Sequence, residues 1–149
     1  MPTLSTTAST GPTQPANVDA CAPIVAYEAE PDITKAVRGV LTSVITYATN
    51  EHNGARGCFL ASCVSTSVGE VEGVDERMEK AIKGTDVRLA SRFGLEKEQG
   101  TLPPNFPSQQ RGRLMYDMRQ GFVFRGGAGW SGETLLEDIE DRVQMILAI

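Results

Sequence analysis

The sequence predicts an all-α domain, and three observations carry that prediction. Apolar residues recur at steps of three and four through the long segments, no segment alternates convincingly between apolar and polar residues, and Gly-, Pro- or Asn-containing stretches separate the periodic segments. A chain of 149 residues fits one ordinary domain. We therefore expect a helical bundle of about six helices.

The N-terminal stretch differs in composition from the rest of the chain. Residues 1–17, MPTLSTTASTGPTQPAN, are mainly Ser, Thr, Pro and Gly and offer almost nothing to bury. Such a segment cannot offset its ordering entropy, so we expect it to be disordered and the domain to span residues 18–149. Asp19 is placed to cap a short apolar helix through Tyr27 that ends before Pro31.

The next segment is a longer amphipathic helix. Asp32 is its expected N-cap, and Asn50 lies where the helix should end. Its apolar residues keep helical spacing: Ile33, Val37, Val40, Leu41, Val44, Ile45 and Ala48.

A Gly-rich turn then leads abruptly into the apolar segment 58–68, CFLASCVSTSV. We interpret this segment as a buried helix. Two chemical alternatives are weak. His52 and Cys58 could form a nucleophile and base, but nothing in the sequence fixes their geometry. Cys58 and Cys63 are five residues apart, and no second pair completes a metal site. We expect no catalytic residues, no metal and no cofactor.

A charged helix follows, starting at Gly73 or Asp75. Gly84 in its middle should mark a bend or a tight contact. Gly100 is placed as its C-cap, and the prolines after it forbid continuation. The apolar face comprises Met78, Ile82, Leu89 and Phe93.

The last third of the chain predicts two more long helices. Ser108 should cap the first, and Ser131 or Gly132 the second, after the break GGAGWSGE. The final helix runs from Leu135 to Leu147 and has an acidic side with Glu137, Asp138, Glu140 and Asp141. The first of the two is apolar on two sides. One side carries Leu114, Met115, Met118 and Phe122, and the other Tyr116, Val123 and Phe124.

Those extra apolar residues predict a homodimer, because a single chain would leave them exposed to solvent. Exposed apolar surface usually marks an association site. Two long helices per subunit pack readily as a four-helix bundle about a two-fold axis. The expected interface residues are Tyr116, Val123, Phe124, Leu136, Ile139, Val143 and Ile146, with Met145 and Ile149 beyond them.

Charge and composition exclude some classes of function. The net charge is −5, and the chain has no basic stripe of the kind that binds nucleic acid. No stretch is long and apolar enough for a membrane span, and the N-terminus has no signal core. Three cysteines without paired spacing suit a reducing compartment, so we expect a cytoplasmic protein.

The order of the motifs ARGCFLASC, EQGTLPP and RQGFVFRGGAG resembles the C-terminal half of the TetR family of bacterial transcriptional repressors. The resemblance covers residues 19–149. It implies a ligand-binding and dimerisation domain, paired through the last two long helices. The family's N-terminal helix-turn-helix DNA-binding domain has no counterpart, since residues 1–17 stand in its place. DNA would therefore be bound only through that missing domain.

By this resemblance the helix after Arg56 borders a cavity for a small organic effector. Met and aromatic side chains make adaptable apolar walls, although the same residues would also fill a solid core. The implied wall residues are Tyr47, Phe59, Cys63, Met115, Met118 and Phe122. The alternative function is a structural, truncated subunit that forms heterodimers with full-length regulators and modulates them without binding a ligand.

Overall fold

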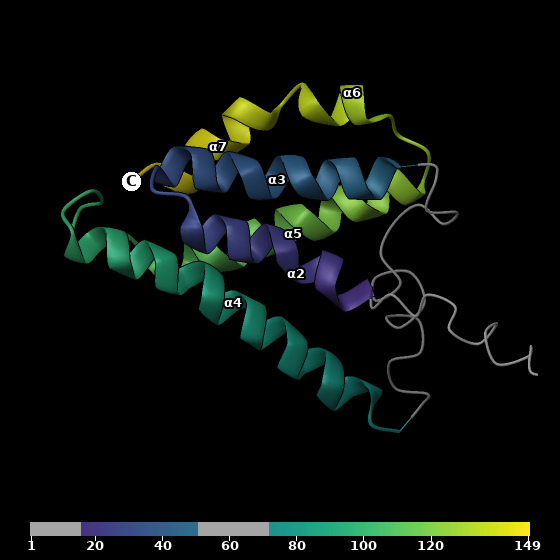
Figure 1. The fold of residues 1–149 in the computed structure, drawn as a ribbon, viewed down its shortest axis with the longest axis horizontal. Helices are drawn as coiled ribbons and strands as arrows, with labels where there is room; N and C mark the ends of the chain where they lie inside the picture. Colours follow the sequence, from purple (N-terminus) through teal and green to yellow (C-terminus); the bar gives the residue numbers. More distant parts are fainter. Residues whose placement is uncertain (1–15, 51–71) are drawn as a thin grey trace, which may run out of the picture.

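The computed structural model describes residues 16–50 and 72–149, and helices form most of both ranges (Figure 1). The all-α prediction is confirmed for this part of the chain, which contains no strand. The total number of helices and the dimeric bundle stay predictions. The described helices are α2 (Ala16–Ala29), α3 (Ile33–Thr49), α4 (Val74–Glu98), α5 (Ser108–Gly127), α6 (Gly132–Leu136) and α7 (Ile139–Leu147).

Helix α3 lies at the centre of the fold. It packs against α2 on one side, α6 and α7 on the other, and α5 behind it, while α4 runs along α5 and touches α2 (Figure 1). Its apolar face is buried as the spacing predicted, and Asp32 caps it by accepting a 3.0 Å hydrogen bond from the Lys35 amide. Asn50 is the C-cap, also as predicted.

The start of α2 differs from the prediction. The helix begins at Ala16, so Ala16 and Asn17 are helical and Asp19 lies inside α2 rather than at its cap. The predicted disorder of residues 1–15 lies outside the described residues. Further along, Ile24 and Tyr27 are buried against the core.

Helix α4 starts after Gly73, as predicted, but its C-cap is Gln99 and not the predicted Gly100. Gly73 is its N-cap in the left-handed region (φ 85°). At the other end Gly100 is also left-handed (φ 84°), and its amide bonds to the Lys97 carbonyl while the Thr101 amide bonds to the Glu96 carbonyl. This pair of bonds is a Schellman motif, which a Gly at that position permits.

Two close crossings set the positions of α5. A Cβ on Gly126 would lie 2.6 Å from the Ala48 carbonyl oxygen of α3, and one on Gly112 would lie 3.1 Å from the Ala90 amide of α4. Ser108 was predicted to be the N-cap of α5, but it is the first residue of the helix. The N-cap is Pro107. The two helices adjacent to α5 therefore approach it at positions where it carries no side chain.

The final helix is interrupted, whereas the sequence predicted one helix from Leu135 to Leu147. Ser131 caps α6 as expected, accepting a 3.1 Å hydrogen bond from the Thr134 amide. The Glu137 amide then bonds to the Thr134 carbonyl, three residues back, which tightens the last turn and ends α6. Helix α7 begins after Asp138.

Polar contacts fix α7 at both of its ends. Arg38 of α3 makes a two-pronged ion pair with Glu140, at 2.6 and 2.9 Å. Arg111 of α5 donates to the carbonyls of Met145 (2.8 Å), Ile146 (2.9 Å) and Ala148. Since the last carbonyls of a helix lack partners within it, Arg111 acts as a C-terminal cap supplied by another helix.

Candidate functional site

The predicted effector wall does not form a single surface in the described residues. Met115 and Phe122 are fully buried in the core, Met118 is partly buried beside it, and Tyr47 is 45% exposed. None of these side chains lines any of four hollows on the described surface, which are found at α4, between α4 and α5, and between α2 and α3. Phe59 and Cys63 lie outside the described residues, as do His52 and Cys58.

Several residues predicted for the dimer interface are buried within one chain. Val123 was expected to be exposed to solvent in a single chain, and this is wrong, because it is buried in the core. Ile139, Val143 and Ile146, which were predicted to be interface residues, belong to the same core. Their helices pack on α3, which the sequence pattern did not reveal. Tyr116 is partly buried against the same core. The exposed apolar side chains in this region are Phe124, Leu136, Met145 and Ile149, all of which the interface prediction named, and Trp130.

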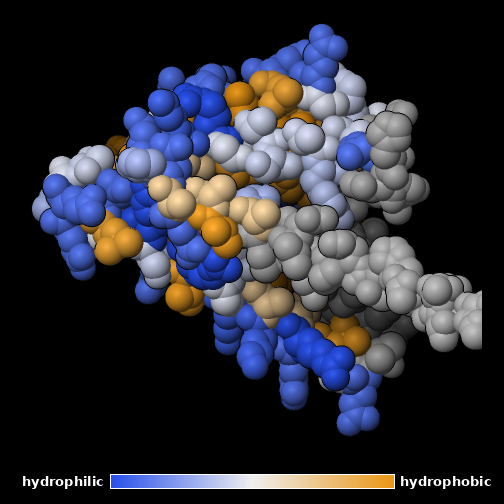
Figure 2. All heavy atoms as spheres, viewed as in Figure 1, coloured by the Kyte–Doolittle hydropathy of each residue, from blue (hydrophilic) through white to orange (hydrophobic). Residues whose placement is uncertain are grey.

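On the face shown in Figure 2, hydrophilic side chains line the outer edge of the molecule along α4, and hydrophobic side chains gather in small separate areas. The first half of α4 is polar and poorly covered. None of residues 74–88 is buried, whereas Leu89, Arg92, Phe93 and Glu96 are.

The second half of α4 holds a buried polar network that joins it to α2. Arg92 donates to Glu96 Oε1 (2.9 Å) and to the carbonyls of Tyr27 (2.5 Å) and Pro31 (3.2 Å). The Tyr27 hydroxyl donates to the Leu89 carbonyl (2.8 Å), and burial raises the pKa of Tyr27 above its usual value, with Arg92 opposing. Because Arg92 holds carbonyls at the end of α2, the network has a structural role.

The most site-like feature in the described surface is a groove between α4 and α5, which we call the α4–α5 groove. Its volume is about 490 Å³, within the usual range of small-molecule sites. A second hollow of about 520 Å³ shares Lys83, Asp86 and Arg113 with it and extends it along α4 past Met78 and Ile82. The groove is lined by Lys83, Asp86, Val87, Ala90 and Ser91 of α4 and by Ser108, Gln109 and Arg113 of α5.

Two polar atoms in this groove have no partner. Asp86 Oδ1 and Ser108 Oγ are shielded from solvent and make no hydrogen bond within the structure. Burial raises the pKa of Asp86 above its usual value; Arg113 opposes that rise and Asp117 adds to it. Shielded polar atoms without a partner are costly, so each one calls for an explanation.

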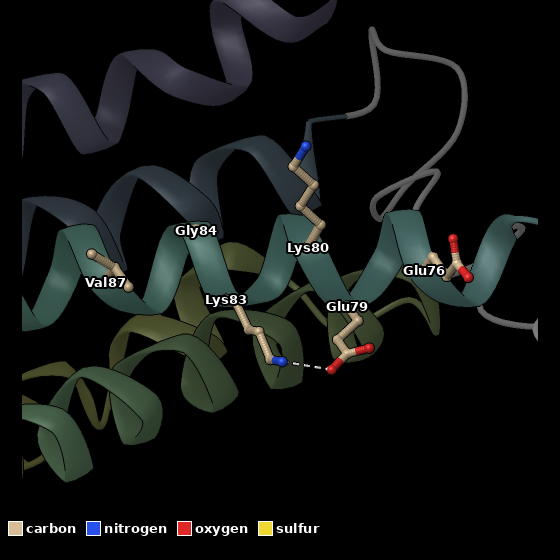
Figure 3. A pocket seen from close by; sticks show the side chains of 6 residues that line it. All are labelled: Glu76, Glu79, Lys80, Lys83, Gly84 and Val87. Carbon is tan, nitrogen blue, oxygen red and sulfur yellow. Dashed lines mark ion pairs between the residues drawn. The ribbon is translucent and has the colours of Figure 1, made fainter.

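A neighbouring hollow of about 520 Å³ is different in kind (Figure 3). Its walls in the described residues all come from α4: Glu76, Glu79, Lys80, Lys83, Gly84 and Val87. Lys83 and Glu79 form an exposed 2.6 Å ion pair there, drawn as the dashed line in Figure 3. A Cβ on Gly84 would meet nothing within 4 Å among the described residues, so these residues give no support to the tight contact predicted for this glycine. We interpret this hollow as a solvated helix face.

Sequence reasoning missed Asp86 and Arg113, and a signal for them was not available. The two residues are distant in the sequence, and only the packing of α4 on α5 brings them to one groove. Arg92 and Glu96 could have been found, since their spacing places both on the helix face that carries Leu89 and Phe93.

Comparisons of the chain with family models, with curated proteins and with solved structures gave no match. Within the described residues, no group of three or more His, Cys, Asp and Glu side chains is placed to hold a metal ion. Of the described helices, none has the length and apolar character needed to cross a membrane.

Proposed function

We propose that the chain is a dimerising, effector-binding domain of a transcriptional regulator of the TetR type, and that it acts by binding and not by catalysis. The observation that supports this best is the arrangement of α5 and α7. These two helices make a closely held pair that carries unpartnered apolar side chains.

The pair is antiparallel. Arg111, near the start of α5, reaches the carbonyls at the end of α7, while Arg142 of α7 lies over the Phe122 ring in the second half of α5, 4.8 Å from its centre. Two such helices are half of an antiparallel four-helix bundle, and a two-fold operation on them completes it.

The outer sides of the pair supply both apolar and charged groups for a second copy. Phe124 is 57% exposed and Met145 is 59% exposed. Arg125 is exposed on α5 next to Phe124, whereas Asp141 is exposed on α7 and Glu137 just before it. Because a two-fold interface sets the same surface against itself, a basic α5 facing an acidic α7 is electrostatically favourable in both halves.

For the effector, the α4–α5 groove has better support than the wall implied by the family resemblance. The groove has a suitable volume and unsatisfied polar atoms. Met115 and Phe122 instead fill the core. Tyr47, Phe59, Cys63 and Met118 keep their proposed role only as predictions.

Sedimentation of the purified chain tests the dimer. We expect a mass of twice 16.0 kDa, and we expect Phe124→Glu combined with Met145→Glu to reduce it to one chain. Leu95→Glu is the matched control, because Leu95 is 53% exposed on α4 and should leave the mass unchanged. A wild-type mass of one chain at all concentrations would refute the proposal.

A second function is favoured by the complete burial of Met115 and Phe122, since a filled core needs no ligand. In that case the chain is a structural subunit that pairs with related regulators. The two functions differ in a simple measurement: a structural subunit dimerises, but no small molecule raises its melting temperature.

A further inference from the structure

We propose that the α4–α5 groove binds a small zwitterion of the amino-acid class, with the ammonium group on Asp86 and the carboxylate on Arg113. This inference names the effector class for the proposed regulatory function and rests on that function for its biological meaning. The binding itself requires only the groove within one chain.

The groove presents two opposite charges that do not neutralise each other by contact. Asp86 and Arg113 both line it, and neither takes part in an ion pair within 4.0 Å in the described part of the chain. Arg113 is nevertheless near enough to lower the pKa of Asp86. A ligand that carries both charges a few ångströms apart can therefore bridge the two side chains.

Asp86 is suited to the ammonium end. Asp86 lines the groove and its Oδ1 atom makes no hydrogen bond within the structure, so an incoming N–H donor can pair with this carboxylate without displacing a protein partner. Asp117 adds negative potential at the same place. Lys83 does not compete for Asp86, because it is paired with Glu79 at 2.6 Å.

Arg113 is suited to the carboxylate end. A guanidinium group can hold a carboxylate through two parallel hydrogen bonds. Ser108 and Gln109, in the first turn of α5, bring the positive end of this 20-residue helix to the same groove. Arg113 is exposed, so it can reach a ligand without breaking a contact in the core.

The remaining walls set the kind of side chain that the ligand carries. Val87, which is 63% exposed, and Ala90 provide an apolar surface between the charged groups and Ser91. We therefore expect a medium-sized apolar side chain, as in leucine or methionine. A bare ammonium or a bare carboxylate would use only one of the two charges.

Three compounds that share the leucine side chain separate these contributions by calorimetry on the full chain. Leucine carries both charges, leucinamide only the cation, and N-acetylleucine only the anion. We expect leucine to bind about 10- to 100-fold more tightly than either single-charge compound, the range for losing one charge-assisted hydrogen bond. Equal affinity of N-acetylleucine and leucine would overturn the proposal, and so would no binding by leucine or methionine.

Two variants locate the charges. Asp86→Asn should remove the preference for leucine over N-acetylleucine, and Arg113→Gln should remove the preference for leucine over leucinamide. Glu98→Gln and Arg77→Gln are matched controls outside the groove and should bind leucine as the wild type does. Unchanged preferences in both groove variants would place the site elsewhere and reject the assignment.

Failure of this proposal is distinguishable from failure of the proposed function. Loss of dimerisation in sedimentation would leave leucine binding intact, because both helices of the groove belong to one chain. Conversely, a dimer that does not bind leucine or methionine would retain the regulator hypothesis without this effector class.

Discussion

The two halves of α4 differ in the burial and bonding of their charged residues. In the second half, Arg92 and Glu96 are 6% and 4% exposed, and Arg92 bonds to Glu96 and to the carbonyls of Tyr27 and Pro31. In the first half no residue is buried, yet Asp86 has a carboxylate oxygen that is both shielded and unpartnered.

The difference indicates which charges hold the fold and which are available for binding. A buried ion pair that also satisfies helix carbonyls has its bonding groups occupied within the fold. Removing one member leaves an uncompensated charge. A carboxylate with a shielded oxygen that has no partner is costly to the fold and favours an external donor. The contrast within one helix therefore separates a structural network from a candidate site.

The largest expected effect is on the buried network. Arg92→Met should lower the free energy of unfolding by about 3 to 5 kcal/mol, because it leaves Glu96 buried without its partner. Urea denaturation provides the measurement. Arg88→Met is the control one turn earlier: its ion pair with Glu28 is partly exposed, so the cost should be only about 0 to 1 kcal/mol. Equal costs for the two variants would contradict the contrast.

A tightly packed glycine should be the next most sensitive position. Gly126→Ala should destabilise the domain by about 1 to 3 kcal/mol, because its Cβ would lie 2.6 Å from the Ala48 carbonyl oxygen and force α3 and α5 apart. Thermal unfolding followed by circular dichroism would measure this. An unchanged melting temperature would mean that the crossing is looser than described.

A Gly→Ala substitution in the first half of α4, which is not packed against other described helices at Gly84, should have the opposite effect on stability. Gly84→Ala should stabilise the domain by up to about 1 kcal/mol, because an Ala there meets nothing within 4 Å and favours the helix. The same unfolding measurement applies. Destabilisation would show that another segment packs against this face.

The smallest effect concerns Asp86 and depends on pH. Its folded-state pKa is raised, so its favourable contribution is present below the unfolded pKa of about 3.9 and is lost as pH rises through the folded value. Asp86→Asn should thus be more stable than the wild type at pH 7, by about 0.5 kcal/mol or less, and should lose this advantage near pH 3. Denaturation curves at both pH values test it, and an advantage that persists at pH 3 would exclude the ionisation as its cause.

Local hydrogen-bond chemistry explains which parts of the fold were predictable. Asp32, Ser131 and Gly100 mark helix ends because each satisfies backbone groups within a few residues. The prediction was wrong where distant packing decides, as for Val123, which was expected on the surface and lies in the core of the same chain. A periodic pattern shows that a helix has an apolar face, but it does not show which surface covers that face.

The same distinction applies to the candidate site. Asp86 and Arg113 belong to different helices, and their meeting depends on how far α5 is shifted along α4. That shift is set by the Gly112–Ala90 approach, a feature of three-dimensional packing. Residues that act together across two helices therefore need the structure to identify them.

The capping of α7 by Arg111 has a consequence for amide hydrogen exchange. Helix α7 has nine residues, fewer than the roughly 12 to 15 at which an isolated helix becomes even marginally stable. Because its last carbonyls are held by a side chain of α5, its terminal turn cannot fray without first releasing that guanidinium. The amides of α7 should then exchange at the rate at which α5 opens, so that the two helices form a single cooperative unit although a separate short helix lies between them in the sequence.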